Sequence, residues 1–558
     1  MKQYFPKISL IILILIGLLL RLNNLTKLPP SLYSDEADIA YQAKTLNSCG
    51  TDYFGNFLPT RFHSFSDWQP PFYIYSVALA QKFFGVNEIS TRLPSAIFGL
   101  LSIICFYFLL KKLFNETYGL LGTAFLVFNP WHIHFSRISF GVTGQIIFFI
   151  LPLLFFFIYL KSKKLIHFSL FVCLNFLQIY FYSTAPITIF FTFLGVFILW
   201  FKELCSLKLK QYFLIFIFSF LVLLPFIGDT LSGKSSYRFN YISIFTDPTI
   251  PQQVDFQRQT DSFNKFGDQI GLTPSLFSKT IHNKIFSTLN LFTTNYLKSF
   301  SPEFLLIQGD TNLRQGFGNH GQLYLIEFVF ILFGILVSFK KPSKISWLFL
   351  SFMLTIPIAS SLTRDSNSAH ATRLFLQLVP FGYFFTIGLN SFFKNKIILF
   401  ISTVLYLISI TNFWHLYQNH YPHYSAPSWD SGLKEVSLLS SQYPNQKIFF
   451  SSSIQNQLPF FLIWNKSSDR FLCQLNSNLK HVSLTHFNGL QLDNYFFGNI
   501  EWSQIINYPE LKNSIFAIPV TEVPTVKSQL KEGNTFTILH QIDLPWQQSI
   551  DYQIIKIN

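Results

Sequence analysis

The chain has 558 residues, of which 50% are hydrophobic and 19% aromatic, while only 12% are charged. A typical soluble domain carries about 25% charged residues, so this composition excludes an ordinary water-soluble protein, and it equally excludes a disordered or collagen-like chain. The net charge of +14 would suit a nucleic-acid or an anionic-lipid surface, and the positions of the lysines decide between these alternatives.

Uncharged apolar segments recur along residues 1–413, and most approach the roughly 20 residues that a helix needs to cross a bilayer. We expect an α-helical polytopic membrane protein with about eleven transmembrane helices. These helices begin near Ile8, Ile89, Tyr118, Val142, Leu165, Ala185, Gln211, Leu323, Ile345, Arg373 and Ile397. The first segment has no small-residue cleavage site after Arg21, so we expect an anchor rather than a signal peptide.

Lysines cluster in every second connection between the expected spans. They are Lys2, Lys7, Lys111, Lys112, Lys161, Lys163, Lys164, Lys202, Lys208, Lys210, Lys340, Lys341, Lys344, Lys394 and Lys396. Because lysines collect in the cytoplasmic loops of membrane proteins, we expect a multi-pass protein of the cell (plasma) membrane with a cytoplasmic amino terminus. Topology then explains the positive charge, and no nucleic-acid partner is expected.

On this topology the long polar segments, residues 23–88, 230–322 and 414–558, lie on the outer side. Residues 1–413 are expected to form the transmembrane domain with the first two of these segments as outer loops, and residues 414–558 a small extracytoplasmic α/β domain. In that domain a helical pattern covers Asp430–Leu439. Strand patterns cover Lys447–Ser452, Ser514–Val520, Thr535–Leu544 and Tyr552–Ile557.

The five cysteines lie far apart, which indicates neither a disulfide framework nor a zinc site. Cys49 and Cys473 both fall in outer segments, and whether they pair is open. The sequence contains no Walker loop, dinucleotide-binding glycine pattern or zinc-protease motif. No metal ligands are therefore predicted, and ATP or NAD chemistry is unsupported.

Two acids open a predicted helix in the first outer segment. Asp35 and Glu36 follow Ser34, a favourable helix N-cap. Acids at this position often only complement the helix dipole, which is worth about 0.3–1 kcal/mol. A carboxylate close to lipid headgroups is also a candidate for chemistry, since the dipole keeps it ionised as a general base must be. Asp35 is the candidate base, and Glu36 either orients an acceptor or caps the helix.

Single cationic residues stand at the outer ends of the spans. They are Arg92, Arg137, Arg238, Arg364 and Arg373, with His370 close before the last. Each one alone could simply extend to the membrane interface. Several that converge would form an anion site, because a guanidinium offers paired donors to phosphoryl oxygens.

A series of motifs resembles the C superfamily of membrane glycosyltransferases, in the bacterial branch that is similar to protein mannosyltransferases and aminoarabinose transferases. The resemblance covers nearly the whole chain and rests on the order of the motifs. They are Asp35-Glu36, Gly55 to Pro59, Gln69-Pro-Pro-Phe-Tyr, Arg92-Leu-Pro-Ser, Asn129 to Arg137, Arg238 to Phe245, Phe300 to Leu305, Gly309-Asp310, Gly321 to Tyr324, Leu362-Thr-Arg-Asp, His370-Ala-Thr-Arg373 and Tyr417 to Tyr424.

The resemblance implies transfer of a sugar from a polyprenyl-phosphate donor to a protein, lipid or glycan acceptor at the outer face. By the same likeness, Asp35 is the base, the reaction inverts the anomeric centre, and the donor phosphate binds Arg137, Arg238, His370 and Arg373. Whether a divalent cation assists is left open.

Two other functions remain as alternatives. A transporter or flippase of lipid-linked substrates would also have many spans, but it would favour acids within them, and here the acids avoid the spans almost entirely, apart from Glu327 near the end of one. A membrane scaffold whose outer domain binds a partner is the other. Consumption of a polyprenyl-phospho-sugar would separate the enzyme from both.

Overall fold

The computed structural model describes residues 5–65, 67–205, 208–266, 274–364, 369–451, 457–505, 511, 513–529, 535–544 and 550–557. The chain divides by its internal contacts into two compact units. The helical unit comprises Met1–Leu18, Phe98–Phe135 and Gly141–Phe413, and the mixed unit comprises Leu19–Ile97, Ser136–Phe140 and Trp414–Asn558. Residue 414, the expected start of the C-terminal domain, also begins a segment of the mixed unit. The first outer segment, residues 23–88, belongs to this same unit, whereas it was expected to belong with residues 1–413. Lys2 and Ser452 lie outside the described residues.

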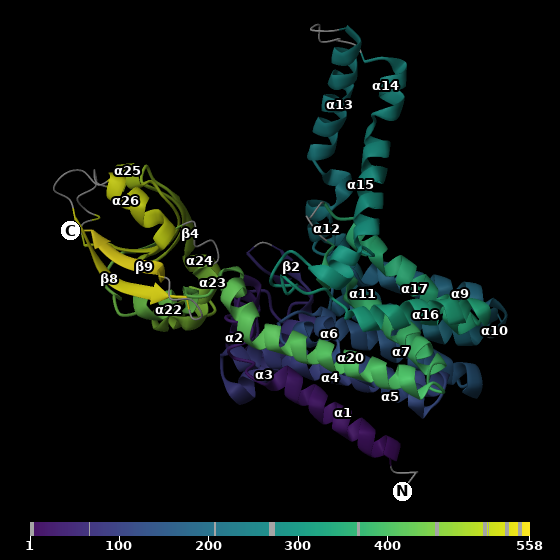
Figure 1. The fold of residues 1–558 in the computed structure, drawn as a ribbon. Helices are drawn as coiled ribbons and strands as arrows, with labels where there is room; N and C mark the ends of the chain where they lie inside the picture. Colours follow the sequence, from purple (N-terminus) through teal and green to yellow (C-terminus); the bar gives the residue numbers. More distant parts are fainter. Residues whose placement is uncertain are drawn as a thin grey trace. The chain divides into compact units, whose positions relative to one another are not determined.

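All eleven expected spans lie in helices (Figure 1). The corresponding helices are α1 (Phe5–Leu22), α4 (Glu88–Leu113), α5 (Glu116–Phe128), α7 (Val142–Ser162), α8 (Leu165–Phe176), α9 (Ala185–Leu199), α11 (Leu209–Leu231), α16 (Leu325–Lys340), α17 (Lys344–Ser361), α18 with α19 (Ala371–Leu374, Leu378–Ser391) and α20 (Lys396–His415). Six helices of the described chain are long and apolar enough to cross a membrane. The others are 12 to 18 residues long. The polytopic helical fold class is confirmed, and the count of eleven crossings stays a prediction.

Close helix packing builds the helical unit, and the pair α16 and α19 is the clearest case. A Cβ atom at Gly334 would lie 1.9 Å from the carbonyl oxygen of Phe384, and one at Gly388 would lie 1.9 Å from that of Phe330. Glycine is therefore required at both positions, since small residues let helix backbones approach inside a membrane bundle. The remaining elements of this unit are α6 (Pro130–Phe135), η1 (Leu177–Tyr180), α10 (Phe201–Cys205), α12 (Tyr237–Ile242), η2 (Ile244–Thr246), α13 (Thr249–Phe266), α14 (Leu276–Ile281), α15 (Lys284–Lys298), η3 (Glu303–Ile307) and η4 (Phe375–Gln377).

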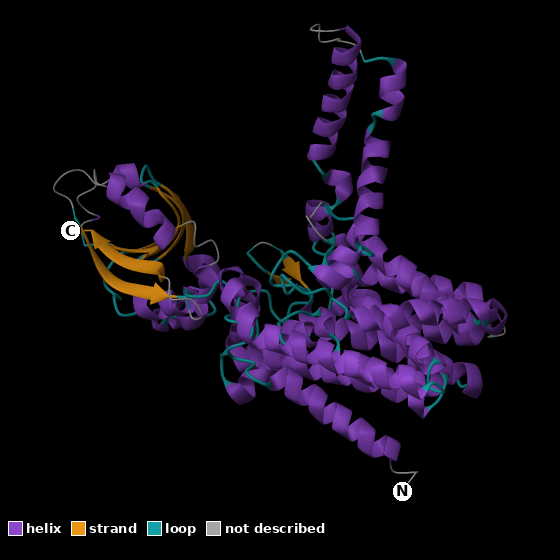
Figure 2. Ribbon diagram, in the orientation of Figure 1, coloured by secondary structure: helices purple, strands orange, loops and turns teal. Residues whose placement is uncertain are grey.

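The mixed unit holds all the strands of the described chain, which Figure 2 draws in orange. Its seven-stranded sheet has the order β4-β5-β6-β3-β7-β9-β8, with β3 parallel to β6 and β7. The strands are β3 (Ile448–Ser451), β4 (Leu479–Ser483), β5 (Phe487–Leu492), β6 (Tyr495–Ile500), β7 (Ile515–Pro519), β8 (Phe536–Asp543) and β9 (Ile550–Ile557). The α/β prediction is thus correct, and the four predicted strands correspond to β3, β7, β8 and β9. The antiparallel strands β4 to β6 were not predicted.

Alternating side chains of the central strands fill a core on each face of the sheet. Phe449 and Phe516 pack with α25 (Trp502–Ile505) and α26 (Val523–Gln529). Their neighbours Ile448 and Ile515 pack on the other face, with α22 (Leu433–Ser440) and α23 (Gln457–Trp464). A strand that is covered on both faces is apolar throughout, as β3 and β7 are. The predicted helix Asp430–Leu439 corresponds to α22.

The helix α2 (Ser34–Cys49) of the first outer segment belongs to the same core. Ala37, Ala40 and Tyr41 are buried in the cluster that also contains residues of α22, α23 and β3. Cys49 forms a disulfide with Cys473, which settles the pairing that the sequence left open. The other elements of this unit are β1 (Phe62–His63), β2 (Trp68–Gln69), α3 (Pro71–Phe84), η5 (Leu416–His420), α21 (Tyr421–Ser425), η6 (Ala426–Trp429), η7 (Lys466–Phe471), α24 (Leu475–Asn478) and η9 (Val520–Glu522).

Candidate functional site

The amino end of α2 carries the two predicted acids, and the structure treats them differently. Asp35 is exposed in the first turn, whereas Glu36 is fully buried. Ser34 is the first helical residue and does not cap the helix as expected. Its backbone N–H instead donates to Asp430 Oδ2 at 3.0 Å, so a carboxylate almost 400 residues away supplies the anion at this helix end.

Glu36 lies in a buried ion pair with Arg92. The Arg92 guanidinium donates from Nη2 to Glu36 Oε2 at 2.8 Å and from Nε to Oε1 at 3.2 Å. It also donates to the carbonyl oxygens of Leu25, Pro29 and Ser31. The Ser139 backbone N–H adds a third hydrogen bond to Glu36, at 2.7 Å. Both charged groups thus have hydrogen-bond partners besides each other, which a buried ion pair requires in order to be stable.

Arg137 is held in the same manner. It is fully buried and donates to the carbonyl oxygens of Leu20, Asn23 and Leu28 at 2.6 to 2.9 Å. Its guanidinium also faces the ring of Tyr417 at 5.8 Å. Burial lowers the pKa of Arg137. Of the four residues predicted to hold the donor phosphate, this one lies in the mixed unit, and its terminal nitrogens already carry three backbone oxygens.

The other three predicted phosphate ligands come together in the helical unit. Burial, followed by the positive charges of Arg373 and Arg238, lowers the pKa of His370 to about 3, so these two arginines interact electrostatically with His370. Arg238 is exposed, while Arg373 and His370 are half-buried. Whether the trio binds one phosphate stays a prediction.

Neighbouring side chains organise the trio. Arg373 donates from Nη1 to the Thr363 hydroxyl and interacts electrostatically with Asp310. Asp310 is buried and accepts the backbone N–H of Ala371 at 2.9 Å, so it fixes the start of the segment that carries Arg373. Sequence reasoning gave Asp310 no role. An acid within an outer segment, at a position whose neighbours in the sequence indicate burial, is the signal that could have identified Asp310.

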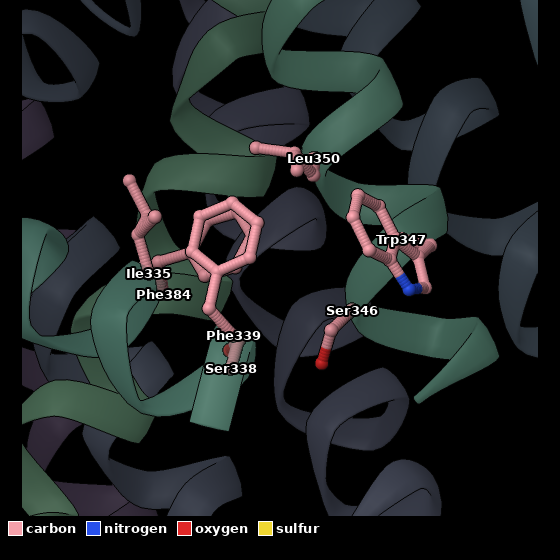
Figure 3. Close-up of a pocket in the computed structure, with 7 residues that line it drawn as sticks. All are labelled: Ile335, Ser338, Phe339, Ser346, Trp347, Leu350 and Phe384. Carbon is pink, nitrogen blue, oxygen red and sulfur yellow. The ribbon is translucent and has the colours of Figure 1, made fainter. Parts of the chain in front are cut away.

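A hollow that is open to solvent has an empty volume of about 710 Å³. One of its lining residues, Leu362, directly precedes Thr363 in the chain. Apolar side chains make up most of its lining, which consists of Ile244, Phe245, Lys284, Ile285, Thr288, Leu289, Phe292 and Leu362. A second hollow lies between α16, α17 and α19 (Figure 3), and its lining includes Ile335, Phe339, Trp347 and Phe384. Ser338 and Ser346 are the polar residues there, so it offers no charge for a phosphate.

No group of three or more histidine, cysteine, aspartate or glutamate side chains that could hold a metal ion lies together among the described residues. The described residues therefore do not test whether a divalent cation assists.

Residues 68–228 match the family model of the dolichyl-phosphate-mannose-protein mannosyltransferases. Over this range, the match agrees with the resemblance that the motifs indicated. The matched range includes Arg92 and Arg137 but begins after Asp35 and ends before Arg238. No curated protein sequence matches the chain at a significant level.

Two solved structures are similar to this chain. One is the oligosaccharyltransferase AglB from Archaeoglobus fulgidus in complex with an inhibitory peptide and a dolichol-phosphate, with 13% identity and a TM-score of 0.47 over 84% of this chain. The chain spans 65% of the length of AglB. The other is ArnT from Cupriavidus metallidurans bound to undecaprenyl phosphate, with 10% identity and a TM-score of 0.45 over 98% of this chain and 97% of ArnT.

Proposed function

We propose that this protein is a membrane glycosyltransferase that moves a sugar from a polyprenyl-phosphate donor to an acceptor hydroxyl on the outer face of the membrane, with inversion. The observation that carries the proposal is the trio of Arg238, His370 and Arg373 beside an apolar hollow. A polyprenyl phosphate joins an anion to a long apolar chain, and this part of the molecule offers a partner for each.

The cations suit the donor headgroup. Arg238 and Arg373 repel one another and the protonated form of His370, so an anion between them relieves that repulsion. A guanidinium donates paired hydrogen bonds to phosphoryl oxygens. The hollow whose lining includes Leu362 receives the first prenyl units. A hydrocarbon that covers its apolar lining removes that lining from water, which is favourable.

Asp35 is proposed as the base. It is exposed at the amino end of α2, where the helix dipole favours the ionised carboxylate. The carboxylate takes the proton of the acceptor hydroxyl, whose oxygen forms a bond to the anomeric carbon. The bond from that carbon to the donor phosphate breaks, and the lipid phosphate leaves with the electron pair. Cations that face the departing phosphate stabilise the transition state more than the ground state.

Glu36 and Arg137 keep a place in the proposal, with roles that follow from their contacts. Glu36 anchors the first turn of α2 through Arg92 and thereby fixes where Asp35 points. Arg137 ties the end of α1 and the segment after it to one point through its terminal nitrogens, while its buried Nε has no hydrogen-bond partner among the described residues. Its loss is expected to act on folding before it acts on donor affinity.

The test is the variant Asp35→Asn in purified protein supplied with a radiolabelled polyprenyl-phospho-sugar. We expect transfer to fall by about 100-fold or more, the usual effect of removing a general base, while thermal unfolding stays unchanged. Asp543→Asn, which removes an exposed acid of β8, is the matched control and should retain full activity. Full transfer by Asp35→Asn would remove Asp35 from its role. Movement of the intact donor across vesicles without consumption would favour a flippase.

A further inference from the structure

A third carboxyl stands on α2, one helical turn after Asp35. Asp38 is 4% exposed, in contrast with the exposed Asp35. Side chains three residues apart share one face of a helix, so these two acids are neighbours. The function proposed above uses Asp35 and Glu36 and gives Asp38 no part.

Asp38 is the centre of a hydrogen-bond network that joins α2 to the rest of the first outer segment. The Tyr53 hydroxyl donates to Oδ1 at 2.8 Å, and Gln69 Nε2 donates to Oδ2 at 3.1 Å. The Tyr53 ring stacks on Phe65 with centroids 4.8 Å apart. Gln69 lies in β2, where it pairs with Phe62 of β1. The Asp38 carboxyl therefore ties α2 to the β1–β2 hairpin, together with Gln42, whose Nε2 donates to the His63 carbonyl oxygen at 2.6 Å.

The surroundings of Asp38 contain anions and neutral donors. Asp35 faces it from its own helix, Tyr53 from the turn that follows, and Ser64 and Asp67 from the hairpin. The packed helix α23 (Gln457–Trp464) has no ionisable side chain. On α3, the Tyr73 hydroxyl hydrogen-bonds to Thr91 and Ser95 rather than to Asp38.

Two cations of the neighbouring helical segments have other partners. Arg92 pairs with Glu36, and Lys44 pairs with Asp469. Burial, with the negative charges of Asp35 and Asp67, raises the pKa of Asp38 to about 7, although the hydrogen bonds of Tyr53 and Ser64 lower it in part. The group changes its charge near neutral pH, whereas an ordinary aspartate is ionised there.

We propose that Asp38 is a positioning residue for the reaction at Asp35: it ties the first turns of α2 to the hairpin and, once it loses its proton, sets a second negative charge beside the base. This inference rests on the proposed function. The added charge raises the proton affinity of Asp35, and a carboxylate of higher proton affinity is a stronger base. Asp38 does not touch the acceptor, and the proton of the acceptor hydroxyl still goes to Asp35.

The experiment compares the pH profiles of transfer for the wild type, Asp38→Asn and the double variant Asp38→Asn with Gln69→Glu. Asparagine can accept from Tyr53, and the Gln69 amide can rotate to accept in return, so the network survives without a titrating group. The double variant returns a carboxyl to the same hydrogen bond. We expect the wild-type rate to rise about threefold more than that of Asp38→Asn between about pH 6 and pH 8, and the double variant to regain this difference. A wild-type profile in Asp38→Asn overturns the proposal.

Stability provides a readout that does not depend on the reaction. A carboxyl whose pKa is raised on folding stabilises the protein below its unfolded pKa, and this contribution is lost as the pH rises through the folded value. The wild type should therefore lose melting temperature relative to Asp38→Asn from about pH 4 to about pH 7. A pH-independent difference overturns the inference. If this stability shift appears while Asp35→Asn remains fully active, the base assignment fails and the titration of Asp38 stands.

Discussion

The two units hold their arginines in opposite ways. In the mixed unit, Arg92 and Arg137 are fully buried, and backbone carbonyls, with Glu36 in the case of Arg92, accept hydrogen bonds from their terminal nitrogens. In the helical unit, Arg238 and Arg373 are at least partly exposed and lie near each other and near His370. Arginines of the first kind hold the chain in one conformation. Those of the second kind repel one another, and the proposed function gives them a phosphate as their ligand.

Removal of Arg92 tests the first half of the comparison and should have the largest effect on stability. Arg92→Ala leaves the Glu36 carboxylate buried without its partner, and breaking such a pair costs about 3–5 kcal/mol. Unfolding of the detergent-solubilised protein, followed by tryptophan fluorescence, measures the loss. Arg470→Ala is the control, because its pair with Asp493 is exposed and should contribute at most about 1 kcal/mol. Equal stability of the two variants would contradict the structural role of Arg92.

The disulfide tests whether the mixed unit depends on its covalent link. Cys49→Ser should lower the free energy of unfolding by about 2–4 kcal/mol, because Cys49 and Cys473 close a loop of 424 residues in the unfolded chain. Cys105→Ser, which changes a free cysteine, should have little effect. A reducing agent should reproduce the loss in the wild type alone. If reduction leaves the unfolding curve of the wild type unchanged, the disulfide does not stabilise this unit.

Removal of Arg373 or Arg238 tests the second half and should change binding with little loss of stability. Arg373→Ala and Arg238→Ala are each expected to weaken the binding of a polyprenyl phosphate by about 10-fold, since a hydrogen bond to a charged group contributes about 1.5–3 kcal/mol. Binding can be measured by titration of the lipid into protein in nanodiscs. Arg258→Ala on α13, where the guanidinium donates to the carbonyl of His282, is the control. Unchanged affinity in both variants would leave the trio without its proposed ligand.

Much of the architecture could be predicted because its signals are local. A run of apolar residues predicts a helix in a bilayer from its own composition, and all eleven runs are helical. Short apolar segments predicted β3, β7, β8 and β9 for the same reason. The missed strands β4 to β6 contain Gly489, Gly498 and several polar side chains, which weaken the local pattern. They are stabilised by pairing, since β6 pairs with β3, β5 with β6 and β4 with β5.

The candidate site was less predictable because charge alone does not tell a bound arginine from an available one. Arg92 and Arg137 looked like Arg238 and Arg373 in the sequence, since all four stand singly near the ends of spans. Likewise, nothing in the sequence singled out Asp38. Only the carbonyl oxygens and hydroxyl groups brought to these side chains by distant segments distinguish them.

The sequence by itself determined where the chain is apolar enough to enter a membrane, which segments remain polar and which family it resembles, because these properties depend on composition and on the order of nearby residues. The tertiary structure decided which acid of α2 faces solvent, which acid is paired and which is buried without a cation. It also decided that Asp430 supplies the anion at the start of α2 and that Cys49 meets Cys473. These outcomes depend on burial and on contacts between residues hundreds of positions apart, and such contacts leave no periodic signal in the sequence.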